Sequence, residues 1–299
     1  MHPNANPKYN AGYTGDLRAV ISHLERRLVT SQHHGTTKLD DADSYIGGPI
    51  YLVGYSLGAN IITKYLGEES LHGTLPKCIG GGAALGNPLH IASNSIPFPW
   101  NMILAMGVKK SVLQNLSVYK KHHDRGFQSA VKKALLSRTI GQVDDAFAPY
   151  IVRNEGDPPY TTRVGYSNGK EYWHDSSSHR YVGNVSVPLL KVVARDDFLV
   201  FGQFASKLNH CLENPNVVVV KTHCGGHLGW QESPPPAKDS KGKEIPSPWF
   251  GANRGSWSDV AVADFIEALL YIREDNRKKD EEVIENAKEA RMHKIVSRL

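Results

Sequence analysis

A serine between two glycines stands out in residues 54–60, which read Gly-Tyr-Ser-Leu-Gly-Ala-Asn. A short apolar run precedes it at 49–54, and a helical pattern follows it at 57–66. A Gly-x-Ser-x-Gly sequence in this setting is typical of a reactive serine raised on a tight turn, because small neighbours let the backbone adopt a strained conformation. The N–H of Leu57 at the helix start can then donate to an oxyanion. We therefore predict that Ser56 is a nucleophile; an ordinary glycine-rich turn is the alternative.

A serine hydroxyl needs a histidine base held in place by a carboxylate, and two later apolar runs end in residues of these types. The run 187–194 is followed by Asp196 and Asp197, and the run 216–222 leads to His227 in a glycine-rich loop. In folds that carry a nucleophilic serine on such a strand–turn–helix segment, the chain order is serine, acid, histidine. We expect the three to meet at the carboxyl edge of a sheet. Asp197 is favoured as the acid, and Asp196 is the alternative.

The elements that position these residues alternate between strands and helices. Four runs predict strands that are buried on both faces, at 49–54, 77–88, 187–194 and 216–222. A helix over 16–28, with Thr14 as its N-cap, is expected before the first of them. Gly67 is the expected end of the helix that follows Ser56. The alternation predicts an α/β protein with a mainly parallel sheet and helices on its faces.

The segment from about 88 to 184 breaks this alternation. It is mostly helical, aromatic and basic, which indicates a cap inserted over the sheet rather than a separate domain. We predict one domain over 8–270 that includes this cap, followed by a charged helix over 271–299.

Four segments resemble one known family. They read GYSLGANIITKYLGEE at the serine, VPLLKVVARDDFLV at the acid, GGHLGW at the histidine and YNAGYTGDLRAVISHL ahead of the serine. Together they resemble the α/β-hydrolases that include the bacterial YheT-like esterases, the plant embryogenesis-associated hydrolases and the animal ABHD1/2/3-type lipid hydrolases. The resemblance covers about residues 8–270.

The resemblance implies a serine esterase or lipase that acts on acylglycerols, phospholipids or smaller esters through an acyl-enzyme. It implies no metal and no organic cofactor. Carried over by position, Ser56 is the nucleophile, His227 the general base and Asp197 the acid. Phe198 stands where the family usually has a proline, which keeps Asp196 open as the acid. Some relatives transfer acyl groups to alcohols, so acyl transfer stays open beside hydrolysis.

The pattern supplies only the last four strands of such a core. No His-Gly or glycine-rich motif for a second oxyanion N–H precedes Ser56, and the His-Gly in the polar stretch 31–37 is interpreted as an exposed loop. We therefore expect a truncated version of a longer hydrolase with impaired activity. The alternative function is an inactive remnant that binds lipid or a protein partner.

The cap offers two features with two interpretations each. Large apolar residues of the cap could line an acyl-chain pocket or simply pack the cap; they are Phe98, Trp100, Met102 and Met106. Tyr55, beside Ser56, is a further candidate for this pocket. Lysines could bring the cap to an anionic membrane surface or form a solvated helix face; they are Lys109, Lys110, Lys120, Lys121, Lys132 and Lys133.

Composition excludes several other classes of protein. The formal charge of +5 is mild and scattered, which gives no argument for nucleic acid. No apolar run approaches the roughly 20 residues that span a bilayer, and the polar N-terminus carries no secretory signal. Three irregularly spaced cysteines predict neither a disulfide framework nor a zinc site and favour a reducing compartment. The sequence does not determine the cellular location, and cytoplasmic and peripherally membrane-associated locations both stay open.

Overall fold

A computed structural model describes residues 10–30, 48–91, 96–120, 124–151, 158–160, 165–230, 237–238, 244–245 and 256–296. The chain divides into two compact units, Met1–Trp230 and Gln231–Leu299. The first unit holds the sheet, the predicted cap and all the predicted site residues. The predicted domain boundaries at 8, 88, 184 and 270 stay predictions.

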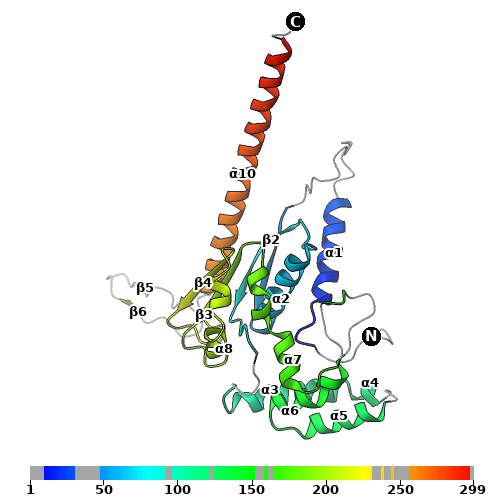
Figure 1. Ribbon diagram of the computed structural model, residues 1–299. Helices are drawn as coiled ribbons and strands as arrows, with labels where there is room; N and C mark the ends of the chain where they lie inside the picture. The colour runs from blue at the N-terminus through cyan, green and yellow to red at the C-terminus, as the bar shows by residue number, and fades with distance from the viewer. Residues whose placement is uncertain are drawn as a thin grey trace. The chain divides into compact units, whose positions relative to one another are not determined.

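A four-stranded sheet forms the centre of the first unit (Figure 1). Its strands are β1 (Ile50–Tyr55), β2 (Ile79–Leu85), β3 (Leu189–Ala194) and β4 (Val217–Thr222). They lie in the order β1-β2-β3-β4, and all three pairings are parallel. The predicted α/β class with a parallel sheet is confirmed.

The helices of this unit fall before, between and after the strands. The longer ones are α1 (Gly15–Thr30), α2 (Leu57–His72), α3 (Trp100–Gln114), α5 (Arg125–Leu136), α6 (Ile140–Phe147) and α7 (Gly169–Ser176). The shorter ones are α4 (Leu116–Lys120), α8 (Phe201–Ala205) and α9 (Asn209–Leu212). The 3₁₀ turns in the described ranges are η2 (Ala148–Tyr150), η3 (Ser178–Arg180) and η4 (Val182–Asn184).

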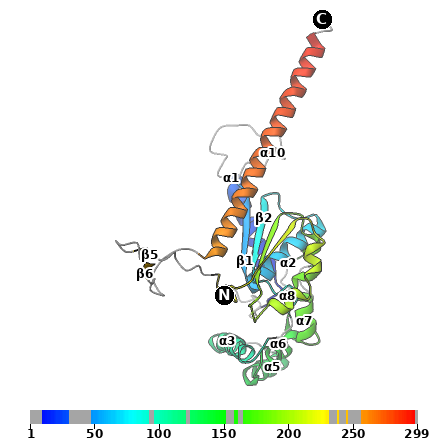
Figure 2. The ribbon, with the colours of Figure 1, turned by 90° about the vertical axis from the view of Figure 1, so that its left-hand side faces the viewer.

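One face of the sheet packs on helices. Leu52 and Leu189 point to this face and join Ile62 and Leu66 of α2 and Ile21 of α1 in one buried cluster. Further along the same face, Val193 of β3 packs with residues of α8 and α9. Figure 2 shows α2 and α8 on the same side of the sheet.

The prediction that all four strands are buried on both faces is wrong for the outer two. Val53 and Tyr55 of β1 and Val218 of β4 alternate to the other face and are 40, 46 and 49% exposed. The central strands β2 and β3 fit the prediction, since all six residues of β3 and all but one of β2 are buried. An apolar sequence therefore did not distinguish an outer strand from a central one.

Helix α2 does not end at Gly67, as predicted, but continues to His72 and is capped by Gly73 in the left-handed conformation. A Cβ at position 67 would lie 2.2 Å from the carbonyl oxygen of Tyr181. Glycine at 67 is thus required by the close approach of the chain between η3 and η4, and the helix tolerates it.

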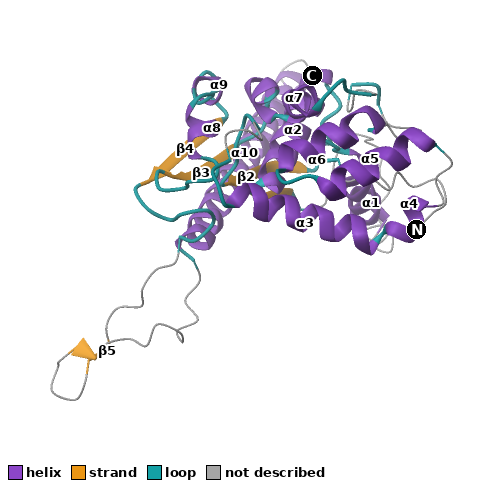
Figure 3. Cartoon of the chain, turned by 90° about the horizontal axis from the view of Figure 1, so that it is seen from below, coloured by secondary structure: helices purple, strands orange, loops and turns teal. Residues whose placement is uncertain are grey.

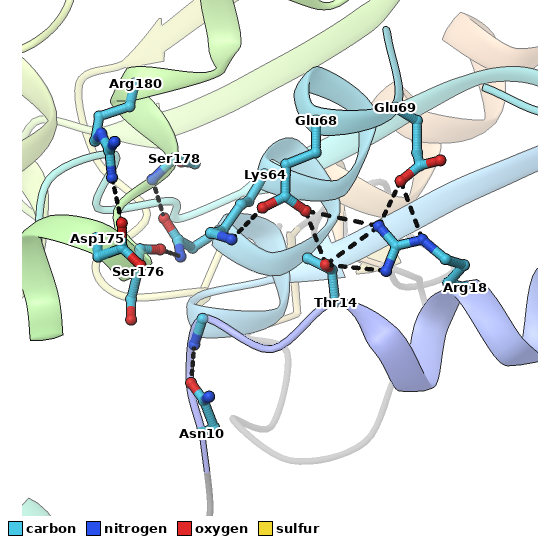
Figure 4. Close-up of polar contacts among 12 residues, drawn as sticks. Asn10, Thr14, Arg18, Lys64, Glu68, Glu69, Asp175, Ser176, Ser178 and Arg180 are labelled. Carbon is cyan, nitrogen blue, oxygen red and sulfur yellow. Dashed lines mark hydrogen bonds and ion pairs between the residues drawn. The ribbon is translucent and has the colours of Figure 1, made fainter. Parts of the chain in front are cut away.

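Thr14 precedes α1, as predicted, and its carbonyl accepts from the N–H of Arg18. Its hydroxyl, however, donates to Oε2 of Glu68 at 2.8 Å. Glu68 also pairs with Lys64, and Arg18 pairs with Glu69 (Figure 4). Lys64 and Glu68 are 1 and 0% exposed. A buried ionic cluster therefore joins α1 to α2.

The cap lies beyond one end of the strands (Figure 1), and α3, α5 and α6 lie side by side in it (Figure 3). Helix α6 starts with a complete capping box formed by Thr139 and Gln142. Two apolar clusters hold the cap helices together, one around Val143 and one around Phe127. The predicted helical segment after 88 is present.

In the second unit, a long helix α10 spans Trp257–Val296, and β5 (Ala237–Lys238) pairs antiparallel with β6 (Glu244–Ile245). Arg277 pairs with Glu274 and Glu281 one turn away on either side. None of the helices in the described ranges is long and apolar enough to cross a membrane.

Candidate active site

Ser56 lies at the junction of β1 and α2 in an unusual backbone conformation. Its φ of 51° and ψ of −117° are disfavoured for a residue with a side chain. Two backbone hydrogen bonds hold it there: its N–H donates to the carbonyl of Leu85 at 2.8 Å, and its carbonyl accepts from the N–H of Asn60 at 3.2 Å. The neighbouring strand and the first turn of α2 thus maintain the strained turn.

The two glycines that flank Ser56 have different surroundings. A Cβ on Gly54 would lie 2.6 Å from the carbonyl oxygen of Gly58, which no side chain tolerates. A Cβ on Gly58 would meet nothing within 4 Å. The expectation that the turn needs small neighbours therefore has a steric basis at Gly54, and Gly58 has space for a methyl group.

Ser56, His227 and Asp197 form a line of hydrogen bonds. Oγ of Ser56 lies 2.9 Å from Nε2 of His227, and Nδ1 of His227 lies 2.9 Å from Oδ2 of Asp197. A carboxylate oxygen only accepts, so Nδ1 carries the ring proton and Nε2 is free to accept from the serine hydroxyl. This is the protonation pattern that a histidine base needs.

Asp197 is fixed in place by its own loop. Its Oδ1 accepts from the N–H groups of Leu199 and Val200 at 3.0 and 3.1 Å, and the residue is 1% exposed. The backbone of the turn after β3 therefore orients the Asp197 carboxylate independently of its bond to His227. Phe198 lies between these residues and is 50% exposed, so the missing proline does not prevent the loop from folding.

Asp196 points to a different partner. Its carboxylate accepts from the N–H of Gly226 at 2.9 Å and from that of Gly225 at 3.3 Å. These glycines directly precede His227 in the chain. The two aspartates thus contact the same loop, one through the imidazole and one through the backbone.

Trp230 supports this loop from inside the protein. Its Nε1 donates to Oγ1 of Thr222 at 2.9 Å, at the end of β4. A Cβ on Gly225 would lie 2.4 Å from the indole ring, and Gly225 has a φ of 146°. Glycine at 225 is thus required twice, by the close ring and by its backbone conformation.

Leu57 is the first residue of α2, where backbone N–H groups have no partner within the helix. Leu57 directly follows Ser56 in the chain, so its N–H lies on the peptide bond that joins the two residues. The predicted role of this N–H as an oxyanion donor stays a prediction. The His-Gly pair in 31–37 lies outside the described residues.

A cavity of about 670 Å³ opens beside Ser56 and extends under the cap. This is within the range of about 300–1,000 Å³ that is usual for small-molecule sites. Ser56 and Leu57 are among its lining residues. The others come from α3, α4, α6, α7 and α8 and from the loops beside them. Most of these side chains are apolar, among them Val108 and Val143.

None of the five residues predicted for the substrate pocket lines this cavity. Tyr55, Phe98, Trp100, Met102 and Met106 are all exposed, by 46, 81, 41, 40 and 58%. The cause is helical periodicity, since α3 turns Leu104, Val108 and Ser111 toward the cavity and Met102 and Met106 away from it.

Two of the five have other identifiable positions. Tyr55 alternates to the far face of β1, and the ring of Trp100 lies 4.9 Å from that of Phe198 beside the acid loop. The residues that sequence reasoning missed are on α6 and α7, chiefly Asp144 and Trp173. Their signal would have been the spacing of apolar residues on the inner sides of the cap helices.

The cap lysines and the possible metal ligands were the remaining candidates for binding. Lys109 donates to the carbonyl of Ser137 at 2.9 Å, and Lys121 lies outside the described residues. Contact of the cap lysines with a membrane stays a prediction. Within the described ranges, no group of three or more His, Cys, Asp or Glu residues is arranged to hold a metal ion.

Comparisons with known proteins point to one kind of hydrolase. No protein-family model matches the chain. It is 27% identical to a yeast monoacylglycerol lipase (Saccharomyces cerevisiae), over 74% of this chain and 43% of the relative. It is 27% identical to the embryogenesis-associated protein EMB8 of Picea glauca, over 87% of this chain and 48% of the relative. It is 29% identical to a monoacylglycerol lipase ABHD2 of Danio rerio, over 87% and 53%.

Solved structures give weaker likenesses. An esterase of Exiguobacterium antarcticum is 13% identical, with a TM-score of 0.36 over 75% of this chain and 69% of the other. The esterase Pf2001 of Pyrococcus furiosus is 16% identical, with a TM-score of 0.33 over 75% and 57%. The fold assignment rests on the chain's own parallel sheet, serine turn and cap.

The chain is thus related to the α/β-hydrolases of the ABHD type, as its sequence motifs predict. It spans about half the length of the curated relatives it matches.

Proposed function

We propose that this chain is a serine hydrolase of carboxylic esters, an esterase or lipase that works through an acyl-enzyme. The observation that carries the proposal is the line of hydrogen bonds from Ser56 through His227 to Asp197, next to an apolar cavity. A serine with a histidine partner at 2.9 Å has a base within reach of its proton. Such an arrangement outside an active site has little structural purpose, because the turn at Ser56 is strained.

The proposed mechanism uses these groups in turn. The Oγ atom of Ser56 attacks the ester carbonyl while Nε2 of His227 takes its proton, and Asp197 stabilises the imidazolium that forms. The N–H of Leu57 donates to the oxyanion of the tetrahedral intermediate. The imidazolium returns the proton to the leaving alcohol, which leaves an acyl-enzyme. Water, activated by the same histidine, then releases the acid.

The apolar lining and the names of the relatives support a lipid-like ester as the substrate. Relatives are called monoacylglycerol lipase and phospholipase. A cavity with mostly apolar walls fits an acyl chain better than a charged or sugar-like group.

Labelling with a fluorophosphonate probe tests this function, because the probe reacts readily only with an activated serine. We expect the chain to be labelled, the Ser56→Ala variant not to be labelled, and the Ser111→Ala variant to be labelled as the parent is. Ser111 is a suitable control since it lines the same cavity without a histidine partner among the described residues. If a folded chain is not labelled, the hydrolase proposal fails, and a lipid- or protein-binding module becomes the better hypothesis.

A further inference from the structure

A carboxyl group lines the mostly apolar cavity under the cap. Asp144 belongs to α6, and its neighbours Ile140, Val143 and Phe147 on the same helix line the cavity with it. A carboxyl group in such a wall is costly to bury unless it has a hydrogen-bonding role.

One of its oxygens is already bonded. Nε1 of Trp173 donates to Oδ2 of Asp144 at 2.5 Å. No donor among the described residues bonds to Oδ1, and this atom is not fully buried. Asp144 therefore has one oxygen fixed by the indole and one that is open to a ligand.

Three other polar groups of the lining are bonded within the protein. The amide nitrogen of Asn115 donates to the carbonyl of Ser111, and that of Gln203 donates to the carbonyl of Leu199. The hydroxyl of Tyr172 accepts from the N–H of Ala11. These bonds hold the three groups to the protein. Asp144 carries the only carboxyl group among the described lining residues, and its Oδ1 has no such bond.

Contacts connect Asp144 to the serine. Leu57, which follows Ser56, packs against the apolar cluster that contains Trp173, and Trp173 holds Asp144. One apolar cluster thus contacts the residue beside the nucleophile and contains the partner of the carboxyl group. Ser56 and Asp144 also line the same cavity.

The charge state of the carboxyl group decides what it can bind. Burial raises the pKa of Asp144 to about 7, against the hydrogen bond from Trp173, which favours the charged form. Near neutral pH a large fraction of the group is therefore protonated. A protonated carboxyl group both donates and accepts, so it matches a neutral hydroxyl better than a cation.

We propose that Asp144 determines specificity by hydrogen bonding to a hydroxyl group of the ester that occupies the cavity. This rests on the proposed function only in taking the ligand to be an ester. The hydroxyl has two sources, the glycerol headgroup of a monoacylglycerol or a hydroxylated acyl chain.

Equilibrium binding to the full chain carrying Ser56→Ala tests this without turnover. The probes are methyl octanoate, methyl octanoate with a terminal hydroxyl, and monooctanoylglycerol. We expect Asp144→Leu to weaken the binding of one or both hydroxylated probes by about 10-fold relative to the binding of methyl octanoate. Asp144→Asn, which can still donate and accept, is expected to stay within about 3-fold of the parent. The probe that loses affinity identifies the source of the hydroxyl.

Asp145→Asn is the matched control, because Asp145 is the adjacent carboxylate and accepts from the N–H of Gly169 rather than lining the cavity. It is expected to leave the ratio between the probes unchanged. The proposal is overturned if Asp144→Leu weakens all three probes equally or weakens none. Because binding is measured without the serine, a failure of this proposal is separate from a failure of labelling at Ser56.

Discussion

The Nδ1 atom of His227 lies 2.9 Å from Oδ2 of Asp197, while the carboxylate of Asp196 binds the backbone of the same loop. Two adjacent carboxylates thus serve one histidine in different ways. Asp197 contacts the imidazole ring and holds its proton on Nδ1. Asp196 fixes the backbone of the loop that carries the histidine. The doublet is therefore not redundant.

Substituting each aspartate by asparagine is expected to separate these tasks. Asp197→Asn should lower kcat by about 10⁴-fold, because the amide no longer favours the proton on Nδ1. Asp196→Asn keeps an acceptor for the N–H of Gly226 and should lower kcat by no more than about 10-fold. Steady-state hydrolysis of a short ester measures both. Equal losses in the two variants would contradict this division of roles.

Alanine at the two glycines of the serine turn should have opposite effects. At Gly54 the added Cβ would lie 2.6 Å from the carbonyl of Gly58, so we expect a loss of about 1–3 kcal/mol in the free energy of unfolding and weaker labelling of Ser56. At Gly58, where α2 begins and space is open, alanine should be neutral or stabilise by up to about 1 kcal/mol. Urea unfolding of the two variants provides the comparison. A strongly destabilised Gly58→Ala would show that position 58 needs glycine for another reason.

The sequence predicted the serine turn, the acid and the histidine loop because each is local. A glycine-flanked serine after an apolar run, or a histidine between glycines, reflects the backbone conformation of a few adjacent residues. Convergence of the three then follows from the parallel order of β1, β3 and β4. The same local reasoning was misleading at Gly67, where the need for glycine comes from Tyr181, a residue far along the chain.

The cavity was predicted poorly for a related reason. Large residues such as Phe98 and Met106 suggested a pocket by size, whereas the side of a helix that faces a cavity depends on how the helices pack. Asp144 was not predicted, since a carboxylate in a polar stretch is usually solvated. Its significance arises only from the Trp173 ring and the apolar wall around it.

The buried ion pair of Lys64 and Glu68 gives a prediction about stability (Figure 4). Lys64→Met should destabilise the chain by about 3–5 kcal/mol, because it leaves a buried carboxylate without its main cation. Lys64→Met combined with Glu68→Leu should recover most of this loss, since no charge then remains unpaired. Urea unfolding at neutral pH measures the cycle. A double variant as unstable as Lys64→Met alone would mean that packing, and not charge, is lost.

Substituting the buried Lys191 should stabilise the chain at neutral pH, unlike substituting Lys64. It lies in the central strand β3 with no exposed surface, and its Nζ donates to Oγ1 of Thr63 at 3.0 Å. Unlike Lys64, it has no carboxylate within ion-pair distance in the part of the chain that the structure describes. Burial lowers the pKa of Lys191 from 10.5 to about 8. The folded state therefore disfavours the charged amine.

The lowered pKa of Lys191 determines how the stability difference between Lys191→Met and the wild type depends on pH. Below about pH 8 the amine is protonated in both states, so the wild type bears the full cost of burying it, on the order of 3 kcal/mol. As the pH rises from about 8 to 10.5 the folded state is neutral, and above 10.5 the cost disappears. Lys191→Met should thus be more stable than the wild type at neutral pH, with an advantage that shrinks toward pH 10.5.

Thermal unfolding across this pH range measures the difference, and Lys221→Met is the matched control. Lys221 is exposed on β4, so its substitution should change stability by less than about 0.5 kcal/mol at any pH. Thr63 keeps its bonds to Asn87 and to the carbonyl of Ala59 in the Lys191 variant, so no buried hydroxyl is left unpaired. A Lys191→Met protein less stable than the wild type at neutral pH would show that the bond to Thr63 outweighs the cost of burying the charge.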